Sequence, residues 1–133
     1  MPSRKRPADP FNPVVDEIRH LMVDRTYAST ISDDMDMYYV RVAGFSPMER
    51  LVDENAEKTK RAEQLVRDLL DAGVAAANAV ARGMRMQGSW REMLLPYVER
   101  HWNVAAVRAA LELVAKRQRD PLTPAARRVL SSG

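Results

Sequence analysis

The chain contains no cysteine, few aromatic side chains and only five glycines among its 133 residues. Without cysteine it has no disulfide, no thiolate zinc site and no cysteine nucleophile. Aromatic residues make up 6% of the chain, while Ala, Val, Leu and Met are plentiful, so we expect an aliphatic core that suits helices. None of the glycines belongs to a phosphate-binding loop of the P-loop or Rossmann type, which excludes nucleotide binding of those kinds.

Long hydrophobic runs are also missing. No apolar run approaches the roughly 18 residues that a membrane-spanning helix needs. The first seven residues are basic, but no hydrophobic stretch follows them, so they do not resemble a signal peptide. We therefore expect a cytoplasmic protein that makes no contact with a membrane.

Residues with catalytic or metal-binding chemistry are sparse. His20 and His101 lie on separate segments, with no further His or Cys at the spacing of a metal site. Carboxylates are frequent between Asp33 and Asp71, but they are spread along helix surfaces and no pair stands out. We therefore expect no metal, no other cofactor, no small-molecule substrate and no enzymatic activity.

The apolar residues that are present recur mainly at helical spacing. This pattern predicts an all-α protein, a small helical bundle of about five to seven helices with one long helix near 47–82. Residues 1–12 form a basic, Pro-rich arm that we expect to be flexible, and residues 13–133 form a single helical domain. Asn12 as N-cap and Pro13 as first helical residue predict a helix that runs to about Tyr27.

Two further helix starts are indicated before the middle of the chain. Ser32 is a candidate N-cap, although residues 37–42 also have the composition of a strand; one isolated strand cannot form a sheet, so we favour a helix. Ser46-Pro47-Met48-Glu49 is a capping box that predicts the start of the long helix, with Gly83 as its stop. The polar stretch 53–61 is either a solvated part of this helix or a break between two helices.

The C-terminal part has its own start signals. Ser89-Trp90-Arg91-Glu92 is a second capping box, and Pro96 should kink or restart the helix that follows it. Asn103 predicts the N-cap of a helix from Val104 to Arg119, and Thr123-Pro124 predicts a last short helix. Trp90, Trp102, Tyr38 and Tyr39 can stack on unpaired bases, but we favour positions as core anchors for all four.

Charge is distributed unevenly along the chain. Residues 1–12 carry a net charge of +2, residues 13–81 carry −5 and residues 82–133 carry +6. This polarity suits a subunit that meets a polyanion with one surface and a protein neighbour with another. Chance is the alternative, and the excess of 17 Arg over 4 Lys is equally explained by GC-rich codon usage.

The candidate ligands for nucleic-acid phosphates are the cations of the basic third, because the planar fork of Arg donates two hydrogen bonds at once. Some surround a loop that contains Gly83 and Gly88, and Arg108, Lys116 and Arg119 are expected along one side of a helix. The whole set is Arg82, Arg85, Arg91, Arg108, Lys116, Arg117, Arg119, Arg127 and Arg128, with Arg4, Lys5 and Arg6 as a mobile supplement. The alternative is a solvated helix face with salt bridges through Glu112.

In outline the chain resembles the small subunit of CRISPR effector complexes. The resemblance rests on overall length, helix-only character, the Ala-rich stretch from Ala72 to Arg82 and the arginines scattered over 82–128. It implies a non-catalytic role in an antiviral ribonucleoprotein. Such a subunit contacts the backbone phosphates of RNA or single-stranded DNA without sequence preference, and it contacts its own copies and other protein subunits.

Two other functions stay open. One is a structural or adaptor protein that self-associates through the long helix from Pro47. The other is a helix-turn-helix regulator of duplex DNA, in which the segment ending at Trp102, the turn at Asn103 and a helix carrying Arg108 form the motif. The first residues of that helix, Val104, Ala105 and Ala106, cannot read bases.

Overall fold

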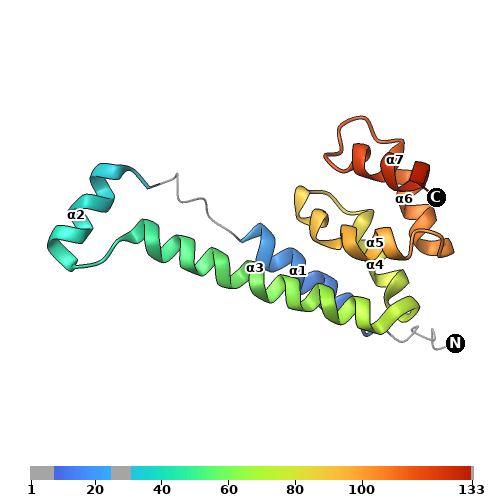
Figure 1. Cartoon of the computed structure of the whole chain (residues 1–133), viewed down its shortest axis with the longest axis horizontal. Helices are drawn as coiled ribbons and strands as arrows, with labels where there is room; N and C mark the ends of the chain where they lie inside the picture. The colour runs from blue at the N-terminus through green and yellow to red at the C-terminus, as the bar shows by residue number, and fades with distance from the viewer. Residues whose placement is uncertain (1–7, 25–30, 133) are drawn as a thin grey trace, which may run out of the picture.

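The computed structural model describes residues 8–24 and 31–132, and these residues are helical or lie in short connecting turns (Figure 1). The predicted all-α bundle is confirmed: the described part of the chain contains no strand. Its α-helices are α1 (Asn12–Val23), α2 (Asp33–Ala43), α3 (Pro47–Ala72), α4 (Ala77–Met84), α5 (Leu95–Arg100), α6 (Ala105–Ala115) and α7 (Thr123–Ser132), with 3-10 turns η2 (Gly73–Ala76) and η3 (Ser89–Leu94).

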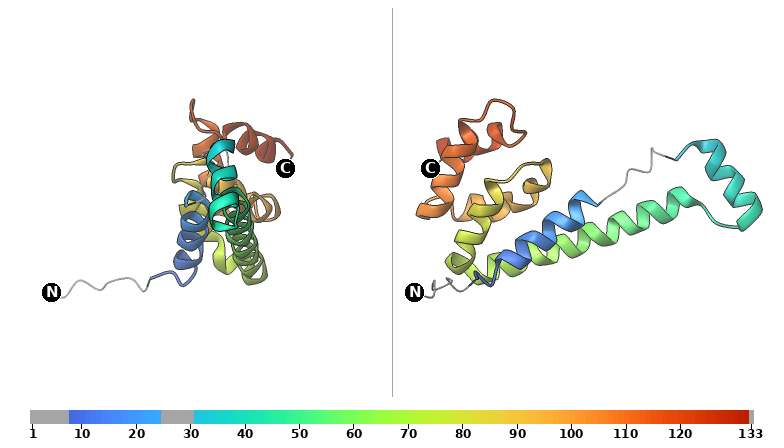
Figure 2. Two further views of the ribbon diagram at one scale, coloured as in Figure 1. Left: turned by 90° about the vertical axis from the view of Figure 1, so that its left-hand side faces the viewer. Right: turned by 180° about the vertical axis from the view of Figure 1, so that it is seen from behind.

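The helices α1 and α3 lie side by side and run antiparallel (Figures 1 and 2). At one end, Lys58 of α3 donates to the backbone carbonyl of Asp24, just after α1, over 3.2 Å. At the other end, Arg82 of α4 donates through Nε to Oδ1 of Asn12, at the start of α1, over 3.0 Å. The α1 helix therefore joins α3 to the C-terminal helices.

The predicted long helix is present as a helical segment from Pro47 to Met84, but it changes direction at Gly73. The polar stretch 53–61 is an uninterrupted part of α3. Gly73 has φ 61 and ψ −139, a conformation that glycine adopts readily and other residues do not, and η2 follows it. Its carbonyl accepts a hydrogen bond from the Tyr97 hydroxyl over 2.5 Å, which ties the bend to α5.

Gly83 is not the stop that the sequence predicts. It is buried inside α4, and a Cβ at this position would lie 2.7 Å from Cγ1 of Val15 and 3.0 Å from Cδ1 of Leu94. The glycine therefore permits the close approach of α1 and η3 to α4. Gly88, by contrast, has φ 103 and lies in the turn that leads into η3.

The predicted starts of α2, α3 and α7 are confirmed. Ser32 accepts from the Met35 N–H, and Ser46 accepts from the Glu49 N–H, each over 3.2 Å. Pro96 restarts a helix, as one of the two predicted outcomes, because it lies in the first turn of α5.

Other predicted caps are wrong. Phe11, not Asn12, takes the N-cap position of α1, and the helix ends at Val23, before the predicted end near Tyr27, which lies outside the described residues. Ser89 caps nothing, since it is the first residue of η3. Val104 replaces Asn103 as the residue before α6, because its own extended backbone (φ −67, ψ 129) makes the turn. Of the predicted arm, residues 1–7 also lie outside the described part, and Phe11 packs against the core.

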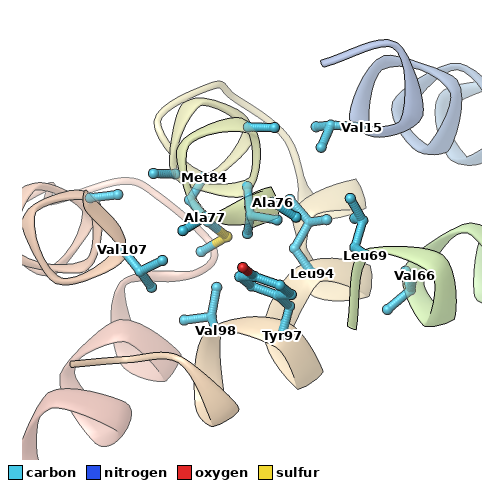
Figure 3. Close-up of a cluster of buried hydrophobic side chains, with 14 of the residues drawn as sticks. Val15, Val66, Leu69, Ala76, Ala77, Met84, Leu94, Tyr97, Val98 and Val107 are labelled. Atoms are coloured by element: carbon cyan, nitrogen blue, oxygen red, sulfur yellow. The ribbon is translucent and has the colours of Figure 1, made fainter. Parts of the chain in front are cut away.

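The core is aliphatic, as expected, and nearly all of it lies between Ala62 and Val129, with Val15 and Ile18 of α1 added. Figure 3 shows side chains from α1, α3, α4, α5 and α6 converging around Tyr97. Trp90 is a core anchor, 5% exposed, and Trp102 packs partly buried against the same cluster.

Within the described ranges, no helix is both long enough and apolar enough to cross a membrane.

Candidate nucleic-acid interface

Arg91 is a structural residue and not a surface ligand, which corrects its place among the predicted phosphate contacts. Its side chain is fully buried and forms a two-pronged pair with Asp120, with Nη1 of Arg91 at 2.9 Å from Oδ2 and Nη2 bonded to Oδ1. Further donations reach the carbonyls of Gly88 (2.7 Å) and Met84 (2.8 Å). A phosphate cannot reach this guanidinium without opening the core.

Asp120 is the centre of this network. Burial raises its pKa, but hydrogen bonds from Arg91, from the Leu122 N–H and from Arg117 outweigh that effect and lower the pKa to about 2. The carboxylate is therefore charged at neutral pH and holds both guanidinium groups in place. No local pattern marks Asp120 as the partner of a residue 29 positions away.

Arg117 joins the turn after α4 to the loop after α6. Its Nη2 donates to the Arg85 carbonyl over 2.7 Å, and its Nη1 donates to the Met86 carbonyl and to Oδ2 of Asp120, each over 3.1 Å. About a quarter of the side chain stays exposed, at 26%. The contact brings the C-terminal ends of two helices together, although they are some thirty residues apart in the chain.

Three more of the predicted cations are paired with acidic side chains. Arg82 binds Asp16 over 2.6 Å and Arg128 lies 3.5 Å from Glu99. Arg108 pairs with Glu112 over 3.3 Å along α6, which is the solvated helix face that the sequence analysis named as the alternative. These pairs are at the surface, so each adds little stability.

The predicted row of Arg108, Lys116 and Arg119 along one helix is wrong. The α6 helix ends at Ala115, so Lys116 occupies its C-cap and Arg119 lies in the following loop. Side chains from the last segment capture the final carbonyls of α6: Thr123 Oγ1 donates to the Val114 carbonyl and Arg127 Nε to the Ala115 carbonyl, both over 3.0 Å. These tertiary contacts replace further helical hydrogen bonds.

What remains is one group of exposed cations at the C-terminal ends of α4 and α6. We call it the basic end, and its members are Arg85, Lys116, Arg119 and Arg127. Within the described ranges, none of the four forms an ion pair with an acidic side chain. The only acidic residue in segments 82–91 and 115–128 is Asp120, whose single negative charge is already shared by the guanidinium groups of Arg91 and Arg117.

The charge of the basic end would suit an anionic ligand. Cations are favourable at helix C-termini, where carbonyls carry partial negative charge, and this effect accounts for Arg117 and Arg127, which donate to carbonyls there. Arg85, Lys116 and Arg119 are exposed as well and, unlike Arg127, are not seen to donate from their side chains to such a carbonyl within the described ranges. A group of exposed cations of this kind favours an anionic ligand.

Two other kinds of site find no support in the described residues: a metal centre and a helix that reads bases. No group of three His, Asp or Glu side chains there could hold a metal ion. The exposed positions of α6 around Arg108 are Ala105, Ala109, Glu112 and Leu113, which are poor readers of base edges. Arg4, Lys5 and Arg6 lie outside the described part.

Comparisons with known proteins leave the family open. No protein-family model matches the chain, and no curated protein and no solved structure matches it either.

A second feature, the exposed apolar surface of α2, was not predicted from the sequence. Tyr38 and Tyr39 were predicted as core anchors, but they are 60% and 39% exposed, and no residue of α2 is buried. This prediction was wrong because helical spacing shows which residues share a face, and not whether another element covers that face.

Proposed function

We propose that this protein binds nucleic acid through the basic end, without catalysis and without sequence preference, as a cytoplasmic subunit of a larger ribonucleoprotein assembly. The supporting observation is the Arg117 contact, which gathers Arg85, Lys116 and Arg119 from two distant segments into one exposed group. RNA or single-stranded DNA is the expected ligand. The resemblance to CRISPR small subunits suggests the kind of assembly. The proposed affinity for nucleic acid rests on the exposed cations and does not depend on that resemblance.

The mechanism is electrostatic. Each cation that neutralises a phosphate releases bound counterions, so affinity falls with salt by a slope of roughly 0.7 per contact on a single strand. Arg127 and Arg128 can add contacts at the edge of the group, since both are exposed. Arg91 contributes indirectly, because it holds the loop after α6 through Asp120.

The test is binding of labelled single-stranded RNA and DNA of mixed sequence at several salt concentrations from about 50 mM upward. In the variant with Arg85→Glu, Lys116→Glu and Arg119→Glu, we expect affinity to fall by at least about tenfold and the salt slope to drop by about 2. The fold should persist, because these side chains are exposed, and circular dichroism checks it.

Arg108→Glu is the matched control, since Arg108 is an exposed arginine that pairs within its own helix. It should leave affinity nearly unchanged. The control reverses one charge and the triple variant reverses three, so a general effect of net charge would give the control about a third of the triple variant's loss in log affinity. Wild-type protein that fails to bind near 50 mM salt would refute the proposal.

A further inference from the structure

The α2 helix carries an apolar stripe that nothing in the described chain covers. Met35, Tyr38 and Val42 are 54%, 60% and 67% exposed, and their spacing of three and four residues places them on one side of the helix. Ile31, four residues before Met35, continues the same spacing just outside the helix. Figure 1 shows α2 at the far end of α3, well away from α6 and α7.

Another side of α2 is already bound to α3. Oδ1 of Asp36 accepts from Ser46 Oγ over 2.7 Å and from the Met48 N–H over 3.0 Å. Asp36 lies roughly 120° around the helix from the centre of the stripe. The contacts with α3 thus fix α2 in place and leave the stripe facing away.

The composition and length of α2 favour a partner helix. Met and Tyr are enriched in protein interfaces, and Met adapts its shape to an uneven surface. A helix of 11 residues with no buried residue has little stability of its own in water. Burial of the stripe against a second helix would give α2 the stability that contacts within its own chain do not provide.

The charges beside the stripe select the partner. With Met35 and Val42 at heptad positions a and Tyr38 at d, the g positions hold Asp34 and Arg41. In an antiparallel pair of identical helices, each g position faces the g position of the other helix. Packing Met35 on Tyr38 of the second copy sets Asp34 opposite Arg41 of that copy, and the two-fold axis makes the ion pair twice.

A parallel pair does not give this match. There each g position faces an e position, and the e position of α2 holds Tyr39. We therefore propose that α2 is a dimerisation helix, which pairs antiparallel with α2 of a second copy of this chain about a two-fold axis between Met35 and Tyr38.

The dimer has a geometric consequence. Because α2 lies at one end of the protein and the C-terminal helices lie toward the other, pairing through α2 keeps the C-terminal helices of the two copies, with their basic ends, apart. Only one short helix of each copy is buried, and residues 31–57 carry a net charge of −5, so the dimer should be weak and form in the micromolar range. This inference does not rest on nucleic-acid binding.

The test is sedimentation of the full chain over the micromolar range, near physiological salt so that long-range repulsion is screened. Asp34→Arg and Arg41→Asp should each raise the dimer dissociation constant by about tenfold, because each replaces two ion pairs with two like-charge contacts. The double variant Asp34→Arg/Arg41→Asp keeps the wild-type net charge and should restore dimerisation. An equimolar mixture of the two single variants should form heterodimers.

Asp33→Arg is the control, since Asp33 shares the first turn of α2 but occupies position f, away from the pair. It should dimerise at least as well as the wild type. The proposal fails if the wild type stays monomeric throughout, which would assign the stripe to another protein. It also fails if the double variant dimerises no better than the single variants.

Discussion

The two ends of the protein use similar apolar helices in opposite ways. Around α4, α5 and α6 the aliphatic side chains are buried, among them Val98, Val107 and Val114 at 0% exposure. On α2 the side chains of Met35, Tyr38 and Val42 are more than half exposed. The difference lies in the neighbours and not in the helices: the C-terminal helices meet from several directions, while in the described part of the chain α2 packs mainly against α3.

The ends also differ in how they treat charge. At the basic end a salt bridge is buried in the core and positions two loops. Toward the α2 end, the pair of Lys58 and Asp24 is open to solvent, with side chains 29% and 63% exposed. Buried and exposed pairs respond very differently to the loss of one partner, so this comparison can be tested directly.

The largest effect is expected from Asp120→Asn. The amide cannot balance the buried guanidinium of Arg91, so the free energy of unfolding should fall by about 3–5 kcal/mol. Asp24→Asn is the matched control, and we expect a much smaller loss there because Asp24 is exposed to solvent. Urea unfolding followed by circular dichroism measures both. Similar losses in the two variants would contradict the contrast between the ends.

A smaller effect is expected from acid. The pKa of Asp120 is about 2 in the folded protein, below its ordinary value of 3.8, so its stabilising charge is fully present above about pH 4. It is lost as the pH falls from about 4 to about 2, and the loss amounts to about 2 kcal/mol. The difference in unfolding free energy between wild type and Asp120→Asn should therefore shrink over this range. A constant difference would mean that Asp120 has no lowered pKa.

The smallest effect is expected on α2. Val42→Ala removes a side chain that is 67% exposed, and the monomer should lose no more than about 0.5 kcal/mol. Val114→Ala removes the same atoms from a fully buried site in α6, and we expect a loss of about 2 kcal/mol. Thermal or urea unfolding at low protein concentration compares the two. A large loss from Val42→Ala would show that α2 packs within its own chain.

Much of the helix layout could be predicted, because caps act over three or four residues. Ser32 and Ser46 were found from the sequence since each satisfies N–H groups of the turn that follows it. The C-terminal ends were harder. The end of α6 at Ala115 depends on Thr123 and Arg127, whose side chains donate from α7 to the last carbonyls of α6. No local sequence pattern predicts these contacts.

The candidate site could be predicted in composition but not in shape. The sequence placed the excess of positive charge in residues 82–133, and the exposed cations of the basic end belong to that region. It could not separate Arg91 from Arg85, which are six residues apart and equally basic. Arg91 is fully buried and Arg85 is exposed, because the fold brings Asp120 into contact with Arg91 alone of the two.

The sequence by itself determined the helical class, the aliphatic core and most helix starts, since spacing and capping are contacts between near neighbours. Only the tertiary structure decided which arginines face solvent and which apolar stripe stays uncovered. Burial depends on residues far away in the chain, as with Arg91 and Asp120, 29 positions apart. A helix carries the pattern of its faces, but other elements decide which of those faces meets water.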